Sequence, residues 1–246
     1  MEQLVNFRSR GQRIYGDFGL PYAGAPCVIM SHGLESSKDG DKWRLLASRL
    51  QRAGFATLRF SYRGCGEGPH RSEGAFEDTT LGGRIEDFKA AIAFLRGTEA
   101  DTARLGVIGS SFGGMVALAS GVTGIKAMVL VATPCRPLMA VDELWEKYGD
   151  EGLLELPSGR RLRVGMVRQV RECDIRLAVA NVGCPLLVIH GSADETVPVS
   201  HAHELYHSAK EPKRLEIIES GNHGIDDPGH RERLVRLATG WFEQYL

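Results

Sequence analysis

The sequence lacks any continuous run of about 20 apolar residues, the length that a helix needs to cross a membrane. Its N-terminal stretch carries scattered charges and no apolar centre, so we expect neither a signal peptide nor a membrane span. The five cysteines form no CxxC pair and no HExxH motif occurs, which favours a reduced, cytoplasmic protein without a bound metal. A net charge of −1 gives no sign of a nucleic-acid partner.

Internal repeats and low-complexity segments are also missing, and short apolar runs alternate instead with longer helical patterns. Hydrophobic residues make up 43% of the 246 positions, which suits one large domain with a sizeable core. After an N-terminal hairpin, this alternation predicts an α/β fold with a mostly parallel central sheet and helices on both faces. Strands are expected at 4–9, 13–21, 27–33, 55–64, 104–110, 125–133, 185–194 and 213–222, and helices at 41–54, 84–97, from 111, 200–210 and 231–246.

Residues 134–184 interrupt this alternation, because about 50 residues are far more than a crossover between two strands needs. We interpret them as a small lid, made of a helix, a hairpin and a second helix, inserted over the carboxyl edge of the sheet. Ligands bind along that edge in open α/β sheets. The lid divides the α/β core into segments 1–133 and 185–246. Trp145, Tyr148, Met139 and Met166 are tentative substrate contacts within it that could line an apolar acyl pocket, and the alternative is that they form the core of the lid.

Charged residues of the predicted lid fall into two groups, with acids in its first half and arginines in its second. They most simply pair with each other or face water, and the alternative is that one arginine binds a carboxylate of an anionic substrate. The acids are Asp142, Glu143, Glu146, Asp150, Glu151 and Glu155, and the arginines are Arg160, Arg161, Arg163, Arg168, Arg171 and Arg176.

The stretch Gly109-Ser110-Ser111-Phe112-Gly113 fits the pattern G-x-S-x-G, in which the central serine lies on a sharp turn between a strand and a helix. The two glycines lack a Cβ that would collide with neighbouring elements. The turn exposes the serine hydroxyl at the positive end of the helix. Ser111 is therefore a candidate nucleophile, and the alternative is a glycine-rich helix start that this serine caps.

A serine hydroxyl is a useful nucleophile only when a base takes its proton, and His223 is the histidine best placed to do so. It follows the last predicted strand, in a loop bounded by glycines at the sheet edge. Asp194 follows the preceding strand and is the candidate acid that orients the imidazole, with Glu195 as the neighbouring alternative. Their order along the chain, Ser111, Asp194, His223, is the order that G-x-S-x-G hydrolases use.

Acyl transfer also needs N–H donors for the oxyanion that develops on the substrate. The amide of Phe112, directly after the serine, is one candidate. The second is the amide of Leu34, because Gly33 ends an early predicted strand and lets the backbone turn the next amide inward.

These motifs, in this order, resemble the α/β-hydrolase superfamily, and within it the bacterial branch of cinnamoyl and feruloyl esterase-like proteins and serine aminopeptidase-type hydrolases. The matching segments are SHGLESSK, FSYRGCGEG, GSSFGG, PLLVIHGSADETVPV and SGNHGI. The resemblance implies an α/β-hydrolase fold with a small lid. It also implies a catalytic triad of Ser111, Asp194 and His223, with the Leu34 and Phe112 amides as the oxyanion hole.

The chain departs from the pattern of this family at two positions. Ser61 stands in FSYRG where the family often has Asp, and Glu67 stands in RGCGEG where it often has Ser. Neither belongs to the triad, but both flank a loop at Arg63, so substrate contacts in that loop are open.

We therefore expect a serine hydrolase, a carboxylesterase that acts on small-molecule esters with short-chain or aromatic acyl groups through an acyl-enzyme. This mechanism requires no cofactor or metal, and a monomer or homodimer is expected. Two alternatives stay open. One is hydrolysis of amides, peptides or thioesters with the same triad, and the other is a non-catalytic binding protein on this scaffold.

Overall fold

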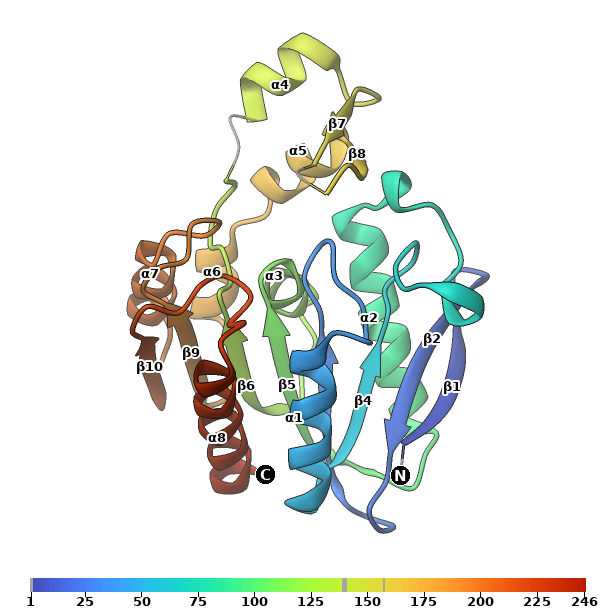
Figure 1. The fold of residues 1–246 in the computed structure, drawn as a ribbon, viewed down its shortest axis with the longest axis vertical. Helices are drawn as coiled ribbons and strands as arrows, with labels where there is room; N and C mark the ends of the chain where they lie inside the picture. The colour runs from blue at the N-terminus through green and yellow to red at the C-terminus, as the bar shows by residue number, and fades with distance from the viewer. Residues whose placement is uncertain (1, 139–140, 157) are drawn as a thin grey trace.

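One sheet of eight strands forms the centre of the computed structural model, which describes residues 2–138, 141–156 and 158–246 (Figure 1). Its strand order is β1-β2-β4-β3-β5-β6-β9-β10. β1 and β2 form an antiparallel hairpin, β2 runs antiparallel to β4, and β4 and the strands beyond it run parallel. The predicted fold class is thus confirmed. The strands are β1 (Glu2–Ser9), β2 (Gln12–Gly19), β3 (Pro26–Ser31), β4 (Ala56–Phe60), β5 (Asp101–Ser110), β6 (Ile125–Val131), β9 (Leu186–Gly191) and β10 (Lys213–Ile218).

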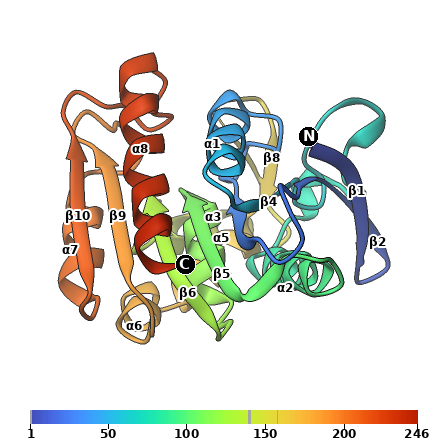
Figure 2. The same ribbon diagram turned by 90° about the horizontal axis from the view of Figure 1, so that it is seen from below.

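Helices cover both faces of the sheet, as Figures 1 and 2 show: α1 and α8 lie on one face, and α2, α3, α6 and α7 on the other. Each face has its own apolar core. Leu46 of α1 and Phe242 of α8 are buried in the first, and Phe88 of α2 in the second. Burial of these two layers is the main favourable contribution to folding. The helices are α1 (Asp41–Arg52), α2 (Leu81–Arg96), α3 (Phe112–Ala119), α6 (Ile175–Ala180), α7 (Ser200–Ser208) and α8 (Pro228–Tyr245).

Local sequence explains where several helices begin. Thr80 caps α2, because its side chain accepts a hydrogen bond from the Gly83 amide. α8 begins at Pro228, three residues before the predicted start at 231. The Asp227 carboxylate accepts from the His230 amide at 3.0 Å, and proline suits the first helical position because it has no N–H to satisfy.

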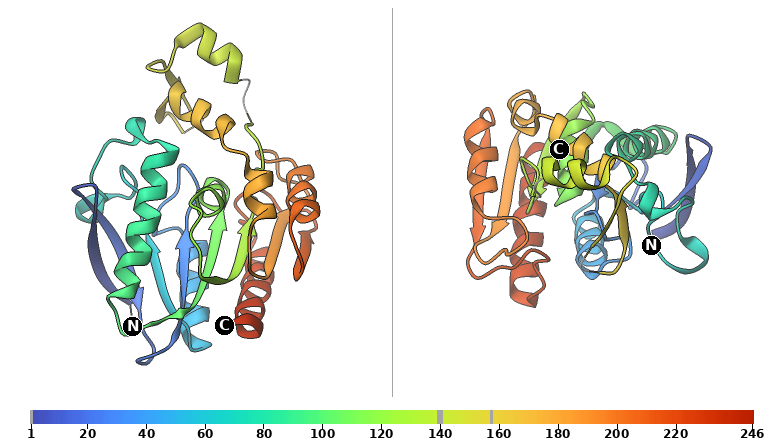
Figure 3. Two further views of the ribbon diagram at one scale, coloured as in Figure 1. Left: turned by 180° about the vertical axis from the view of Figure 1, so that it is seen from behind. Right: turned by 90° about the horizontal axis from the view of Figure 1, so that it is seen from above.

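The chain between β6 and β9 forms a small subdomain above the carboxyl edge of the sheet (Figures 1 and 3). It contains a helix, an antiparallel strand pair and a second helix, which is the predicted order. α6 follows them, contacts α3 and α7, and lies in the helical layer. The elements above the sheet edge are α4 (Val141–Tyr148), β7 (Leu153–Glu155), β8 (Arg161–Arg163) and α5 (Val164–Glu172).

Charged side chains of this subdomain pair with one another, as predicted, and also with the 3₁₀ turn η2 (Phe76–Asp78). These side chains are partly or largely exposed, so each pair contributes little to stability, typically below about 1 kcal/mol. The pairs inside the subdomain are Arg163–Glu151, Arg168–Asp150, Arg168–Glu172 and Arg171–Asp142, and the pairs with η2 are Arg161–Glu77 and Arg163–Asp78.

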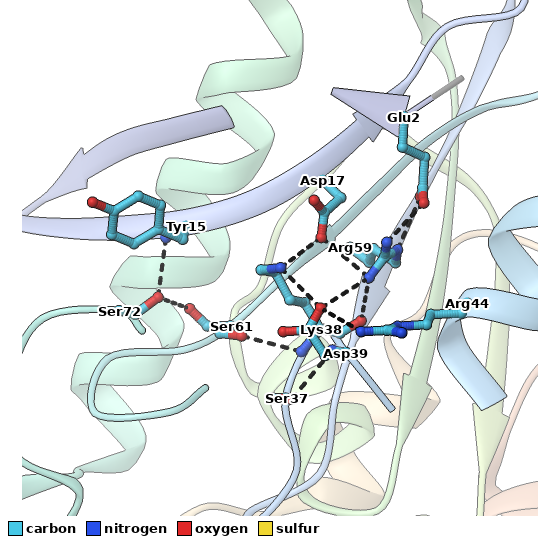
Figure 4. A network of polar contacts seen from close by, with 10 residues as sticks. All are labelled: Glu2, Tyr15, Asp17, Ser37, Lys38, Asp39, Arg44, Arg59, Ser61 and Ser72. Atoms are coloured by element: carbon cyan, nitrogen blue, oxygen red, sulfur yellow. Dashed lines mark hydrogen bonds and ion pairs between the residues drawn. The ribbon is translucent and has the colours of Figure 1, made fainter. Parts of the chain in front are cut away.

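A buried ion network anchors the loop between β3 and α1 to the neighbouring strands (Figure 4). Arg59 of β4 binds both carboxylate oxygens of Glu2, at 2.9 and 2.7 Å, and donates to the Lys38 carbonyl at 2.6 Å. The Lys38 ammonium in turn lies 2.7 Å from Asp17 and 2.9 Å from Asp39. The side chains of Lys38 and Arg59 are only 6% and 8% exposed. The network therefore fixes the end of the loop whose beginning carries Gly33 and Leu34.

Ser61, one of the two departures from the family pattern, belongs to the same region (Figure 4). Its hydroxyl oxygen accepts a hydrogen bond from the Lys38 amide at 3.1 Å, so the serine supports this loop. Arg63 is engaged elsewhere, since its guanidinium lies 2.6 Å from the buried Asp87 carboxylate. Glu67, the other departure, is exposed.

No helix among the described residues is both long enough and apolar enough for a membrane crossing. A cytoplasmic location stays a prediction.

Candidate active site

Ser111 lies at the sharp turn between β5 and α3, with φ 53° and ψ −126°. A positive φ is strained for a residue with a side chain, so the surrounding packing must hold this backbone in place. A Cβ at Gly113 would lie 2.2 Å from the Ser31 carbonyl oxygen, and one at Gly109 would lie 2.6 Å from the Gly114 Cα. Only glycine fits at either position, which confirms the steric role predicted for these two residues.

The structure brings the three predicted triad side chains together. Ser111 Oγ lies 3.1 Å from His223 Nε2, and His223 Nδ1 lies 2.8 Å from Asp194 Oδ2. The His223 side chain is 27% exposed, whereas that of Asp194 is fully buried. Glu195, the alternative acid, is exposed. A Cβ at Gly191 would lie 2.1 Å from the Gly221 carbonyl, so the loop that carries His223 packs directly against the end of β9.

The Asp194 carboxylate is held by hydrogen bonds on both of its oxygens. Oδ1 accepts from the amides of Thr196 and Val197 at 2.9 and 2.8 Å, while Oδ2 faces the imidazole of His223. Burial alone would raise the pKa of Asp194. The hydrogen bonds from His190, His223 and the Val197 amide outweigh burial and hold this pKa well below its ordinary value. The carboxylate is therefore ionised and fixed in orientation.

His190 contacts the candidate acid Asp194, and the sequence analysis did not find it. Its Nε2 lies 2.8 Å from the Val197 carbonyl and 3.1 Å from Asp194 Oδ2, and its side chain is fully buried. Because a carbonyl can only accept, Nε2 carries the proton and is shared between these two oxygens. The available signal was a histidine near the end of a buried strand, four residues before the candidate acid.

The candidate oxyanion loop lies directly beside the serine, since a Cβ at Gly33 would be 3.3 Å from Ser111 Cβ. His32 fixes this loop from below. Its Nε2 accepts from the Tyr62 amide at 3.0 Å, so its proton is on Nδ1, which donates to the Gly33 carbonyl at 2.7 Å. Burial, followed by the positive charge of Arg84, lowers the pKa of His32 to about 3, and the ring is therefore neutral.

Arg84 binds the same loop from α2. Its fully buried guanidinium donates to the carbonyls of Gly33 and Leu34 at 3.3 and 2.7 Å. It also lies 4.9 Å from the ring centroid of Tyr62 and 5.4 Å from that of Phe112. It also donates to Cys65 Sγ at 3.3 Å. Within the described residues it forms no ion pair, so these carbonyls, this sulfur and the two ring faces compensate its burial.

The two predicted oxyanion donors are available to a ligand. In a trans peptide the C=O and N–H point in opposite directions. The Gly33 carbonyl faces His32 and Arg84, so the Leu34 N–H points away from them. No acceptor for the Leu34 amide occurs among the described residues. Phe112 is the first residue of α3, and its amide has no acceptor one turn earlier.

A cavity of about 830 Å³ opens at Ser111 and His223 and has an apolar wall formed by the subdomain above the sheet. Trp145 and Tyr148, two of the tentative substrate contacts, lie on α4, are each 44% exposed and are not among its lining residues. The wall consists of Leu156, Leu162, Met166, Val167 and Val170, of which only Met166 was predicted. Met139, the other methionine of that prediction, lies outside the described residues. Met166, Val167 and Val170 lie on one face of α5, and Leu162 lies just before this helix. This helical spacing of apolar residues could have been recognised in the sequence.

Similarity to known proteins identifies the family of this chain. The sequence model of the prolyl oligopeptidase family (Peptidase_S9) matches residues 42–246. The chain belongs to the prolyl oligopeptidase family. It is a hydrolase of the α/β superfamily, as its motifs predicted.

Individual relatives of this family member are distant. The uncharacterized protein YfhR of Escherichia coli O157:H7 is 29% identical over 233 residues, which cover 90% of this chain and 73% of YfhR. The 2,6-dihydropseudooxynicotine hydrolase of Paenarthrobacter nicotinovorans is 28% identical, over 85% of this chain but only 55% of the hydrolase. Among solved structures, Est1E of Butyrivibrio proteoclasticus with bound ferulic acid has a TM-score of 0.83, with 21% identity and 98% of each chain covered. This last likeness shows a shared fold.

Proposed function

We propose that this family member is a serine esterase that hydrolyses small carboxylic esters through Ser111, His223 and Asp194. The observation that carries the proposal is the line of contacts from Ser111 Oγ to His223 Nε2 (3.1 Å) and from His223 Nδ1 to Asp194 Oδ2 (2.8 Å). The serine end of this line opens into the cavity, and its acid end is buried. Acyl transfer needs a hydroxyl that a base can deprotonate, next to N–H groups that can receive an oxyanion. Ser111 has both, because the Leu34 and Phe112 amides beside it have no acceptor among the described residues.

In the proposed mechanism, His223 takes the proton of Ser111 as Oγ attacks the carbonyl carbon of the ester. The carbonyl oxygen becomes an oxyanion and accepts hydrogen bonds from the Leu34 and Phe112 amides. The imidazolium, stabilised by Asp194, gives its proton to the leaving alcohol, and the acyl group remains on the serine. Water, deprotonated by His223, then attacks the acyl-enzyme and releases the acid. No step uses a cofactor or metal.

The cavity supports short-chain or aromatic acyl groups as substrates. Its wall of Leu, Met and Val side chains is apolar and offers no group that would pair with a charged acyl chain. A volume of about 830 Å³ suits a small ester. The ligand in the Est1E structure, ferulic acid, is likewise a small aromatic acid.

A fluorophosphonate probe tests the nucleophile directly. We expect one covalent adduct, located at Ser111 by mass spectrometry, and none on a Ser111→Ala variant. Ser110→Ala is the matched control, because this neighbouring serine should leave labelling intact. Labelling that persists in Ser111→Ala, or no adduct on the wild type, would contradict the proposal.

A panel of p-nitrophenyl esters of increasing chain length then tests the acyl group. We expect kcat/KM to be highest for acetyl, butyryl or aromatic acyl groups and to fall for long chains. The Ser111→Ala variant should lose on the order of 10⁶-fold in kcat. A maximum at long acyl chains would show that the apolar wall does not limit the substrate.

Amide or peptide hydrolysis is the second candidate, because the matching family is that of prolyl oligopeptidase. The same triad serves esters, thioesters and amides, so only relative rates distinguish them. Matched ester, thioester and anilide substrates with one acyl group would measure this. An anilide that is turned over as fast as the ester would favour a peptidase. Labelling of Ser111 without turnover of any of the three would favour a binding protein.

A further inference from the structure

The cavity has two chemically different sides. Its apolar side, with Leu162, Met166 and Val170, belongs to the same core as α2 and α3, and α5 contacts α2. Its polar side, with Asp41, Lys42 and Arg231, comes from the first turns of α1 and α8, on the other face of the sheet (Figure 1). Ser111 lies at the sheet edge between these two sides.

The proposed reaction places the leaving group of the ester on one side of the cavity and the acyl group on the other. In the proposed mechanism His223 gives its proton to the leaving oxygen, so the leaving group must lie against the His223 loop. That loop leads directly into α8, and its Gly224 and Asp226 line the cavity together with Lys42. The leaving group therefore meets the polar side, and the acyl group extends along the apolar one.

Lys42 differs from the other cations that line the cavity. Arg231 lies 3.5 Å from Asp226 and 3.9 Å from Asp41, and Arg136 lies 3.1 Å from Glu204. Lys42 Nζ forms no ion pair with any residue of the described part of the chain. Its one hydrogen bond there goes to Ser110 Oγ, at 3.1 Å. An ammonium has three N–H donors, so two remain for a ligand.

We infer that Lys42 binds a carboxylate on the leaving group, so that the substrate is an ester between an apolar acid and an alcohol or phenol that carries a carboxylate. This inference rests on the proposed esterase function. An anion contact was expected from the sequence only as an alternative, at an arginine of the upper subdomain, whereas this inference assigns it to Lys42 of α1. Those arginines pair mainly with nearby acids, whereas Lys42 lines the cavity beside the serine and has no acidic partner among the residues that the structure describes.

The surroundings of Lys42 support a charge-dependent contact. Lys42 is partly buried. This burial lowers its pKa to about 8, with Asp226 and Asp194 raising it and Arg231 lowering it. Asp226 is itself occupied by Asn222 Nδ2 at 2.9 Å and by Arg231. At neutral pH the ammonium is therefore charged, incompletely solvated and available to an anion. A ligand carboxylate would restore the hydrogen bonds that burial removes.

The test compares two esters of one acid, p-carboxyphenyl butanoate and p-carbamoylphenyl butanoate, which differ in charge and little in shape. We expect the wild type to favour the carboxylated ester in kcat/KM by about 10- to 100-fold, the effect of one charged hydrogen bond. Lys42→Met, and Lys42→Gln as a second variant, should abolish this preference. For the wild type the preference should also decline as the pH rises through about 8, where the ammonium loses its proton.

Ser110→Ala is the matched control, because it removes the hydrogen-bond partner of Lys42 and keeps the ammonium. We expect this variant to retain the preference. Equal kcat/KM values for the two esters in the wild type would overturn the inference. So would an equal loss for both esters in Lys42→Met, which would show that the lysine only positions Ser110.

Failure of the esterase proposal would be recognised separately, because neither ester would then be hydrolysed and Ser111 would not be labelled. Calorimetry with p-hydroxybenzoate, the carboxylated leaving group, still tests the site in that case. Binding to the wild type that weakens about 10-fold or more in Lys42→Met would support it. Binding that does not depend on Lys42 would overturn it.

Discussion

The guanidinium of Arg84 donates to the Leu34 carbonyl at 2.7 Å, although the two residues are 50 positions apart. The same guanidinium reaches the Gly33 carbonyl at 3.3 Å, on the opposite side of the peptide from the Leu34 N–H. A fully buried cation thus holds the peptide that offers a candidate oxyanion donor. Its charge also polarises that peptide and strengthens the N–H as a donor.

Replacing Arg84 should therefore affect turnover more than substrate binding. We expect Arg84→Met to lower kcat by about 10- to 100-fold with a small change in KM. The reason is that a misplaced Leu34 N–H stabilises the oxyanion of the transition state less well but hardly affects binding of the substrate. Arg84→Lys keeps the positive charge but not the paired hydrogen bonds, so its kcat should lie between those of the wild type and Arg84→Met. Steady-state kinetics and the affinity for a trifluoromethyl ketone, which mimics the oxyanion, measure this. A folded Arg84→Met variant with wild-type kcat would contradict a positioning role.

His190 should support Asp194 without replacing His223. We expect His190→Phe to destabilise the fold by about 1–3 kcal/mol, because the Val197 carbonyl loses its buried donor. Activity should fall, but by less than in Asp194→Asn. Urea denaturation and kcat/KM measure the two effects, with the exposed His203→Gln as control. Unchanged stability and activity would show that the 3.1 Å contact with Asp194 has no consequence.

The depressed pKa of Asp194 predicts a pH dependence of stability. A carboxyl group whose folded pKa lies below its ordinary value of 3.8 stabilises the fold above that pH. This contribution is lost as the pH falls from about 4 towards the lower, folded pKa. We therefore expect the free energy of unfolding to fall more steeply below pH 4 in the wild type than in Asp194→Asn. Parallel slopes in urea titrations of the two proteins would contradict this.

The buried network of Figure 4 should contribute strongly to stability. Arg59→Met removes the partner of Glu2 and one partner of Asp17, both of which are largely buried. We expect a loss of about 3–5 kcal/mol in the free energy of unfolding, because a buried charge is left without its partner. Arg44→Met is the matched control. Its side chain is 59% exposed and pairs only at the edge of the same network, so its loss should stay below about 1 kcal/mol. Equal losses in the two variants would show that burial does not matter here.

Much of this protein follows from local sequence patterns. Alternating strands and helices predicted the parallel sheet, because each pattern depends on neighbours a few residues away. The sharp turn at Ser111 could be predicted from the sequence, because the close approach of neighbouring backbones requires glycine at positions 109 and 113. The positions of Asp194 and His223 also followed, since the carboxyl ends of parallel strands meet at one edge of the sheet.

Tertiary structure decided which side chains surround that edge. In the sequence, Arg84, His190 and Lys42 cannot be distinguished from other charged or polar residues. The roles proposed for them depend on contacts with residues that are distant in the sequence and that only the folded structure brings close. Trp145 and Tyr148 were the most conspicuous residues of the inserted segment, yet α4 leaves them exposed and α5 supplies Met166 to the cavity. Periodicity along one chain reports which residues share a face. It does not report which element that face meets, because contact between distant segments depends on how the whole sheet and its helices assemble.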